Sequence, residues 1–267
     1  MIELHPSEFS SVIPLITCSN QEVIPLAICQ GFNPGRIFID QRDNPQIVMI
    51  WTTVGYYFLF GDPTFIDDMT SISQTLTHGF IPASQSNGET GFILIPNSPS
   101  WKPMLPTLLP GRHVIEIYRK PHNFDLNSFQ LKGDWHTKIP PGLHFQTIDQ
   151  LTAPKIGVLS SWSSIDEFLT NGIGLLLLKD EEIACTCISV FSSSEKVEMD
   201  VHTDEKFRRQ GLADMICSAF IEKCIQLGKL PNWECFWDNQ PSLNLAKKLG
   251  FVAQDEYPVF YWEELIP

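Results

Sequence analysis

The clearest alternation of hydrophobic and polar positions lies between residues 174 and 203. Three runs rich in leucine, isoleucine and valine are separated by polar stretches at 179–182 and 192–196, which are typical of tight turns. In the third run the two classes alternate strictly, with Val197, Met199 and Val201 against Glu198, Asp200 and His202. The pattern predicts three antiparallel strands in a sheet with one packed face and one wet face.

A helical pattern follows these strands. Apolar residues recur at spacings of three and four, and Gly228 ends the run: Leu212, Ile216, Ala219, Phe220 and Cys224. A strand is expected around 233–237, a helix over 240–250 and a final strand or hairpin over 251–262. Before the three strands we expect a short strand at 144–149 and a helix at 160–171.

The first half of the chain also mixes strands and helices. A short helix is expected over 19–30, shortened or kinked by Pro25, and strands over 35–40 and 46–62. A helix is then expected over 63–79, with Gly79 as its end and one apolar face formed by Phe65, Met69, Ile72 and Leu76. The whole chain therefore belongs to the α+β (mixed α/β) class.

Proline and polar residues gather between the two halves, and a domain junction is expected near 125–142. We therefore predict domains at 1–130 and 131–267. Each half has paired strands followed by a helix, which is either an internal duplication or only the common α+β pattern.

The composition of the chain limits its possible partners, the chemistry of its cysteines and its expected location. The chain has 267 residues, 31 acids, 18 bases and a formal net charge of −13, which disfavours nucleic acid and anionic membranes and favours cationic substrates. The seven cysteines include no C-x-x-C pair, so buried free thiols are expected rather than disulfides or a metal site. We find no signal peptide and no run of about 18 apolar residues. The expected location is the cytoplasm.

One short segment carries most of the candidate chemistry. Lys206, Arg208 and Arg209 precede Gly211 and the helix that begins beside it. The start of a helix presents backbone amides and a partial positive charge, so this loop suits an anion such as phosphate. The alternative is a solvated group of charges before an ordinary helix.

This segment resembles the acyl-CoA signature Q/R-x-x-G-x-G/A of the GNAT superfamily of N-acetyltransferases, matched here by residues 208–213. A second family block is similar to residues 237–251, with Asn239, Ser242 and the closing Leu249-Gly250-Phe251. The resemblance spans about 140–267. It implies a GNAT fold with a central, mostly antiparallel sheet flanked by helices, and it leaves open whether the N-terminal α+β domain is a degenerate GNAT-like half. The loop and the extra half also resemble the zwittermicin A resistance-protein type.

The resemblance implies acetyl-CoA as cosubstrate, with its pyrophosphate on the loop amides and its arm along the third strand. No metal is implied. The residues expected to bind the cosubstrate are Val201, Thr203, Arg208, Arg209, Gln210, Gly211, Leu212, Ala213, Asn239 and Ser242.

For catalysis, Glu198 is preferred as the base because family members often hold a glutamate in this strand, and His202 is the second choice. The chain departs from the family at Ala246, where many members have the tyrosine credited with protonating the leaving thiolate. Tyr257 or Tyr261 could replace it or could be packing residues.

The remaining tryptophans and cysteines of interest have less specific interpretations. Trp233 and Trp237 either line the acceptor site or belong to the core, and Cys185 and Cys187 are expected to be buried packing residues. The preferred function is transfer of an acetyl group to the amine of a small molecule by direct attack in a ternary complex. The alternative is a non-catalytic acyl-CoA-binding sensor or scaffold. The acceptor's identity stays open, as does the oligomeric state, monomer or homodimer.

Overall fold

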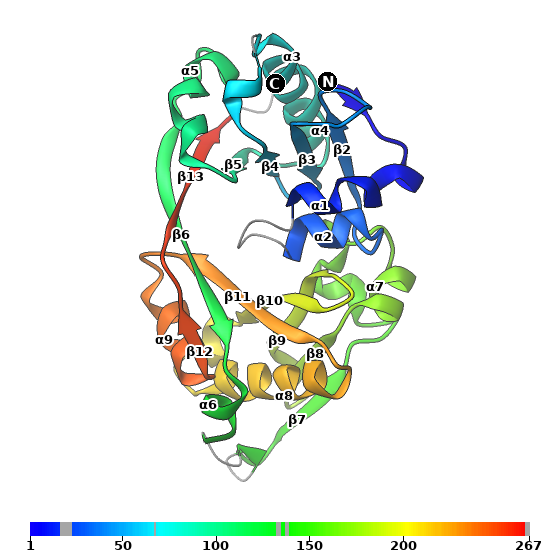
Figure 1. Ribbon diagram of the computed structural model, residues 1–267. Coiled ribbons are helices and arrows are strands. Elements are labelled where there is room, and N and C mark those ends of the chain that lie inside the picture. The colour runs from blue at the N-terminus through cyan, green and yellow to red at the C-terminus, as the bar shows by residue number, and fades with distance from the viewer. Residues whose placement is uncertain (17–22, 67, 132–134, 137–138, 265–267) are drawn as a thin grey trace. The chain divides into compact units, whose positions relative to one another are not determined.

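The computed structural model describes residues 1–16, 23–66, 68–131, 135–136 and 139–264 (Figure 1). It divides the chain into two compact units, which are described separately below. The first unit is Met1–Tyr118 together with Tyr257–Pro267, and the second is Arg119–Glu256.

The first unit is built on a mixed sheet. Its strands, in spatial order, are β1 (Ile2–Glu3), β2 (Gly35–Ile39), β3 (Val48–Thr52), β4 (Tyr56–Phe60), β5 (Gly91–Pro96) and β13 (Tyr257–Glu263). Only β4 and β5 are parallel, and the other neighbours are antiparallel. The helices are η1 (Pro6–Val12), α1 (Ile13–Ile16), α2 (Val23–Cys29), η2 (Pro63–Phe65), α3 (Thr70–Gln74), η3 (Thr75–Phe80), α4 (Ile81–Ser86), η4 (Pro99–Met104) and α5 (Leu105–Leu108).

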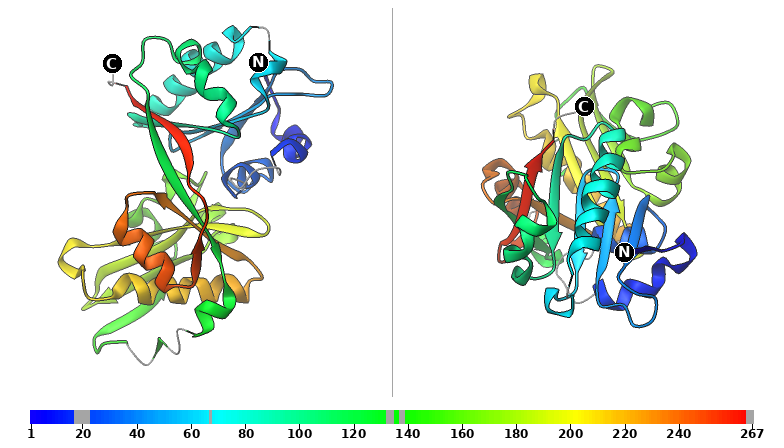
Figure 2. Two further views of the ribbon diagram at one scale, coloured as in Figure 1. Left: turned by 60° about the vertical axis from the view of Figure 1, so that its left-hand side comes forward. Right: turned by 90° about the horizontal axis from the view of Figure 1, so that it is seen from above.

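The helix expected over 63–79 is wrong at both ends. A separate 3-10 turn, η2, precedes it, and Phe65 is 66% exposed rather than part of the apolar face. The helical stretch α3–η3–α4, drawn in cyan in Figure 2, continues past Gly79 to Ser86. It continues because Phe80 and Ile81 extend its buried face. Its middle, η3, is π-helical and lies just before Pro82, which has no N–H to continue the α-helical ladder.

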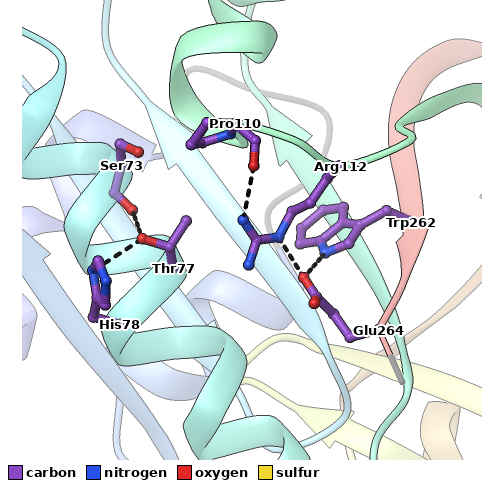
Figure 3. Close-up of polar contacts among 7 residues, drawn as sticks. All are labelled: Ser73, Thr77, His78, Pro110, Arg112, Trp262 and Glu264. Atoms are coloured by element: carbon purple, nitrogen blue, oxygen red, sulfur yellow. Dashed lines mark hydrogen bonds and ion pairs between the residues drawn. The ribbon is translucent and has the colours of Figure 1, made fainter. Parts of the chain in front are cut away.

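Polar contacts fasten the end of β13 within this unit. Arg112 donates from Nε to Glu264 and from a terminal nitrogen to the carbonyl of Pro110, 3.3 Å away (Figure 3). The same Glu264 oxygen accepts from Trp262 Nε1 at 3.2 Å.

Thr77, on η3, donates from Oγ1 to the carbonyl of Ser73 at 2.7 Å, and its Oγ1 lies 3.1 Å from Nδ1 of His78.

The second unit has a sheet in the order β7 (Leu143–Thr147), β8 (Gly174–Lys179), β9 (Glu182–Ser192), β10 (Lys196–Thr203), β11 (Leu230–Phe236) and β6 (Ile115–Phe124), with β12 (Phe251–Ala253) also on β6. The three antiparallel strands expected over 174–203 are confirmed as β8–β10. Only β10 and β11 are parallel. The helices are α6 (Leu126–Leu131), η6 (Ala153–Ile156), η7 (Val158–Ser160), α7 (Ile165–Asn171), η8 (Glu205–Phe207), α8 (Leu212–Gln226) and α9 (Gln240–Lys248).

Two cores form on opposite faces of this sheet. One packs α8 and α9 against Leu177, Cys187 and Val197, and the other packs α7 against Leu176 and Ile188. The expectation of one wet face is therefore wrong for β8 and β9, because α7 covers Leu176 and Ile188 on the face of the sheet that Asp200 and His202 share. The described cysteines are free and buried, as expected, including Cys185 and Cys187, and Cys18 lies outside the described residues.

The compact units differ from the sequence halves 1–130 and 131–267 because two strands pair away from their sequence neighbours. β6 ends in the second unit, where Arg119 and His122 face β11 and Phe124 faces β12. The final strand or hairpin expected over 251–262 is two strands with different partners. β12 pairs with β6, whereas β13 pairs with β5 in the first unit.

The two units repeat one topology. In each unit, three strands pair antiparallel to their neighbours, and a helical segment then leads to a strand that pairs parallel with the third of them; the other edge of that parallel strand pairs with an antiparallel strand. In the first unit these strands are β2–β4, β5 and β13, and in the second they are β8–β10, β11 and β6. In the described part of the chain, no helix is long and apolar enough to cross a membrane.

Candidate functional site

The site begins where two parallel strands part. β10 and β11 pair only from Lys196 opposite Leu230 to Glu198 opposite Asn232, although β10 continues to Thr203. A bulge between Glu198 and Met199 shifts the register with β9 at the same point. A cavity of about 810 Å³ occupies the region between the diverging strands and the helices α8 and α9.

The loop from β10 to α8 has an unusual backbone. Arg209 and Gly211 both adopt the left-handed conformation, at φ 60° and 78°. Glycine takes this conformation without strain, whereas any side chain at position 211 would be strained. A Cβ built on Gly211 meets no protein atom within 4 Å, so the requirement for glycine comes from φ and from whatever enters the cavity.

Hydrogen bonds hold the loop in this shape. Asp204 Oδ1 accepts from the amide of Lys206 at 3.0 Å, which caps η8. Arg208 donates from Nε to the carbonyl of Thr203 at 3.2 Å and from a terminal nitrogen to Glu205 at 3.2 Å. The loop therefore returns close to the end of β10 and delivers the chain to α8 at Gly211.

Helix α8 begins with amides that precede its first internal hydrogen bond, from Met215 N–H to the carbonyl of Gly211. Leu212 and Ala213 occupy its first positions and line the cavity. The start of a helix of this length combines unsatisfied amides with a partial positive charge, and Arg208 and Arg209 add two full charges. This end of the cavity is suited to an anion.

Helix α9 forms another wall. Asn239 caps it by accepting from the amide of Ser242 at 3.2 Å, and Ser242 Oγ accepts from Trp233 Nε1 at 3.0 Å. All three residues line the cavity. Trp233 is also a core residue, at 4% exposed, which confirms the core interpretation, and its place in the acceptor site stays a prediction. Trp237 is 52% exposed and is not among the lining residues.

The structure brings together nearly all residues expected to bind the cosubstrate. Every one of them except Gln210 lines the cavity. Gln210 points elsewhere and donates weakly to the carbonyl of Lys206 at 3.4 Å. The backbone amide of Gln210 remains part of the loop, so its expected role stays a prediction, as do those of the others.

The expected base lies at the point where the strands part. The carboxylate of Glu198 is 9% exposed and accepts a hydrogen bond from Asn232 Nδ2 at 2.5 Å. Glu234 lies nearby and is ion-paired with Arg119 Nε at 2.7 Å. Burial, followed by repulsion from Glu234, raises the pKa of Glu198 to about 8, against the opposing effects of Asn232 and Arg119.

Glu198 does not line the cavity, whereas the next two polar residues on its face of β10 do. Asp200 and His202 are exposed to the cavity. Although Asp200 is open to the cavity, the protein atoms around its carboxyl displace much of the surrounding water, and this desolvation raises its pKa. The nearby His202 opposes the shift. Asp200, which was left outside the expected site, is therefore better placed than Glu198 to touch a molecule in the cavity.

Sequence reasoning also missed Arg119, Glu234 and Phe236. The guanidinium of Arg119 lies 4.8 Å from the centre of the Phe236 ring, and all three residues line the cavity. Arg119 belongs to β6, more than a hundred positions earlier in the chain, and no local pattern marks it. The alternation of β11 could have placed Glu234 and Phe236 on one face of the strand, but it could not have placed them in the same cavity as Asp200.

The position of the family's tyrosine offers no proton donor. Ala246 is fully buried in the core under α9. The two possible replacements, Tyr257 and Tyr261, belong to β13 in the first unit, where Tyr261 donates to Glu263 at 2.5 Å. No group of three or more histidine, cysteine or acidic residues suited to a metal ion occurs among the residues that the structure describes.

The equivalent region of the first unit is built differently. β4 and β5 stay paired as far as Leu59 and Pro96, and the amide of Asn97 still bonds to the Leu59 carbonyl at 2.9 Å. The segment that follows β4 carries Asp62 and Asp68 in place of arginines, each accepting from its own turn. A cavity of about 420 Å³ in this unit lies instead beside α5 and β13, next to Leu105, Arg112 and Phe260.

Comparisons with known proteins agree with this geometry. A family model described as "GNAT acetyltransferase" matches residues 14–260. An uncharacterized N-acetyltransferase of Bacillus subtilis (strain 168), YdfB, is 27% identical over 97% of each chain.

Solved structures share the fold. A GCN5-related N-acetyltransferase-like protein from Streptococcus suis has a TM-score of 0.73 at 22% identity, covering 96% of this chain and 99% of that one. A tandem GNAT protein from the clavulanic acid biosynthesis pathway has a TM-score of 0.61 at 11% identity, covering 98% and 97%. The tandem fold of that protein matches the repeated topology of the two units. With its family model spanning both units, the chain belongs to the GNAT acetyltransferase family and is an N-acetyltransferase.

Proposed function

We propose that the protein transfers the acetyl group of acetyl-CoA to the amine of a small molecule, by direct attack in a ternary complex, at the cavity of the second unit. The observation that carries this proposal is the parting of β10 and β11 after Glu198 and Asn232, beside a cavity that the arginine- and glycine-bearing start of α8 also lines. A single cavity then joins an anion-binding end to an end with carboxylates. This is the arrangement that a long anionic thioester and a cationic amine require.

The cosubstrate fits the residues present. Its pyrophosphate suits the amides from Arg209 to Ala213, because the left-handed backbone at Arg209 and Gly211 turns successive N–H groups toward one side. Its pantetheine arm suits the apolar wall formed by Met199, Val201 and Leu245. Main-chain groups of β10 beyond Glu198 are not paired with β11 and can bond to the arm and polarise the thioester carbonyl.

The reaction is one acyl transfer. The neutral amine forms a bond to the carbonyl carbon, the carbon–sulfur bond breaks, the nitrogen loses a proton to a base, and the departing thiolate takes up a proton. Most of the rate gain comes from holding the two reactants together in the right orientation. We assign the base to Glu198, whose pKa of about 8 suits proton uptake near neutral pH. Because Glu198 does not line the cavity, it takes the proton through a bridging water; His202, which does line the cavity, is the second choice. Because Ala246 has no donor, the thiolate takes its proton from water.

The acceptor end favours a cation. Asp200 and Glu234 line it, and Arg119 neutralises only the second of these through its ion pair. The net charge of −13 adds a long-range attraction for amines. The ring of Phe236 offers an apolar contact for the body of the acceptor.

Two measurements test the proposal. Isothermal titration with acetyl-CoA should show binding, and a complete lack of binding at millimolar concentration would end it. A screen of small amines, read out by release of the CoA thiol, should then find turnover. Binding of acetyl-CoA without turnover of any amine would favour a non-catalytic sensor, the alternative that buried Ala246 raises.

A further inference from the structure

A carboxylate stands at the anion-binding end of the cavity. Asp214 occupies the first turn of α8, lines the cavity and is only 17% exposed. An acid in the first turn of a helix is favourable for the helix itself, because it faces the partial positive charge there. The same carboxylate repels any phosphate that approaches the start of α8, so it opposes the role proposed for the loop.

A lysine from the other helix lies against this carboxylate. Lys248 Nζ is 3.0 Å from Asp214 Oδ2, and Lys248 also lines the cavity. The lysine side chain is 60% exposed although the carboxylate is not, and an ion pair with one partner in solvent adds little to the stability of a fold. Stability is therefore a poor reason for this contact.

The last turn of α9 contains a second lysine, which gives an internal comparison. Lys247 and Lys248 both benefit from the negative end of the helix. Lys247 is exposed and is not among the residues that line the cavity, and it forms no ion pair within the described residues. Only Lys248 reaches the carboxylate at the start of α8.

We propose that Lys248 is an electrostatic positioning residue that neutralises Asp214, so that the start of α8 accepts the pyrophosphate of acetyl-CoA. With the pair intact, the charge of Asp214 is offset, and Arg209 and Arg208, which also contacts Glu205, supply the positive charge of the loop. Without Lys248, the carboxylate of Asp214 faces the incoming phosphates. The inference rests on the proposed function, because it concerns the same cosubstrate.

The experiment measures the affinity of the full-length protein for acetyl-CoA by isothermal titration at fixed ionic strength. Lys248→Ala should raise Kd about tenfold, which corresponds to about 1.4 kcal/mol. The matched control, Lys247→Ala, removes the same charge one position away and should change Kd by less than about twofold. Asp214→Asn should bind at least as tightly as wild type.

The double variant Asp214→Asn/Lys248→Ala decides between two roles for the lysine. If Lys248 acts through Asp214, removing the carboxylate restores Kd to within about threefold of wild type, because the two changes couple. A double variant as weak as Lys248→Ala would overturn the inference, since Lys248 would then act on the phosphate by itself. Equal Kd values for Lys248→Ala and Lys247→Ala would overturn it as well.

A truncated donor separates electrostatics from misfolding. S-acetylpantetheine has no pyrophosphate, so kcat/KM with this donor should be the same for Lys248→Ala and wild type. An equal loss with both donors would mean that the substitution damages the site generally, and the inference would fail. Wild-type protein that binds no acetyl-CoA would overturn the proposed function together with this inference, whereas wild-type binding that Lys248→Ala matches overturns the inference alone.

Discussion

The buried carboxyl of Glu198 makes a prediction about both stability and rate. Its pKa is raised from 4.5 to about 8, mainly by burial. Between these two values the folded protein keeps a proton on Glu198 that the unfolded chain has released. Because the folded state then binds more protons, the free energy of unfolding must fall as pH rises through this range.

The size of the effect follows from the shift. The contribution of Glu198 to the free energy of unfolding should fall by about 1.4 kcal/mol for each pH unit between 4.5 and about 8, and level off above that. Glu198→Gln keeps the size of the side chain and can still bond to Asn232, but it cannot ionise. The variant should therefore match wild type near pH 5 and become more stable than wild type by a few kcal/mol at pH 8–9.

The assay is denaturant unfolding of wild type and Glu198→Gln at each pH unit from 5 to 9, with the difference between the two proteins as the readout. Other titrating groups cancel in this difference. If Glu198 is also the base, kcat/KM of wild type should rise with pH to a midpoint near 8, and Glu198→Gln should lose about 10²–10⁴-fold. A difference in the free energy of unfolding that stays constant from pH 5 to 9 would refute the reasoning, since Glu198 would then be ionised in the folded protein as it is in the unfolded chain.

Further predictions concern the loop, the strand exchange and a buried imidazole. Gly211→Val should abolish measurable acetyl-CoA binding, because φ at this position is 78° and a valine there would be strained. Arg208→Ala, which removes a half-exposed charge, should raise Kd only about tenfold. Equal losses of affinity for the two variants in an isothermal titration would contradict a site built mainly from backbone groups. The fragment 119–256 should unfold in a cooperative thermal transition, whereas the fragment 140–267, which lacks β6, should not. Thermal unfolding of both fragments followed by circular dichroism tests this, and a cooperative transition of the fragment 140–267 would refute it. Burial lowers the pKa of His122, so the protein should lose stability as pH falls below 6.5, and His122→Phe should flatten that slope in unfolding experiments; an unchanged slope would count against it.

Several parts of the molecule follow from the sequence by itself. The alternation over 196–203 and the helical spacing over 212–226 depend on neighbouring residues, so they predict β10 and α8 directly. The arginine- and glycine-bearing loop between them is equally local, since a left-handed backbone at position 211 calls for glycine. These segments carry the resemblance to the family and the residues proposed to bind the cosubstrate.

Long-range pairing was decided only in the tertiary structure. Nothing in residues 257–263 indicates that β13 joins the first unit, because strand partners depend on which edge is available and not on local sequence. The same applies to Arg119, which β6 carries to Glu234, and to Lys248, which α9 brings to Asp214. The proposed acceptor end of the cavity and the charge balance at its proposed phosphate end depend on such contacts, whose energies arise between residues far apart in the chain. Local sequence therefore determined the elements proposed to hold the cosubstrate, while the tertiary structure brought together the charged residues that surround them.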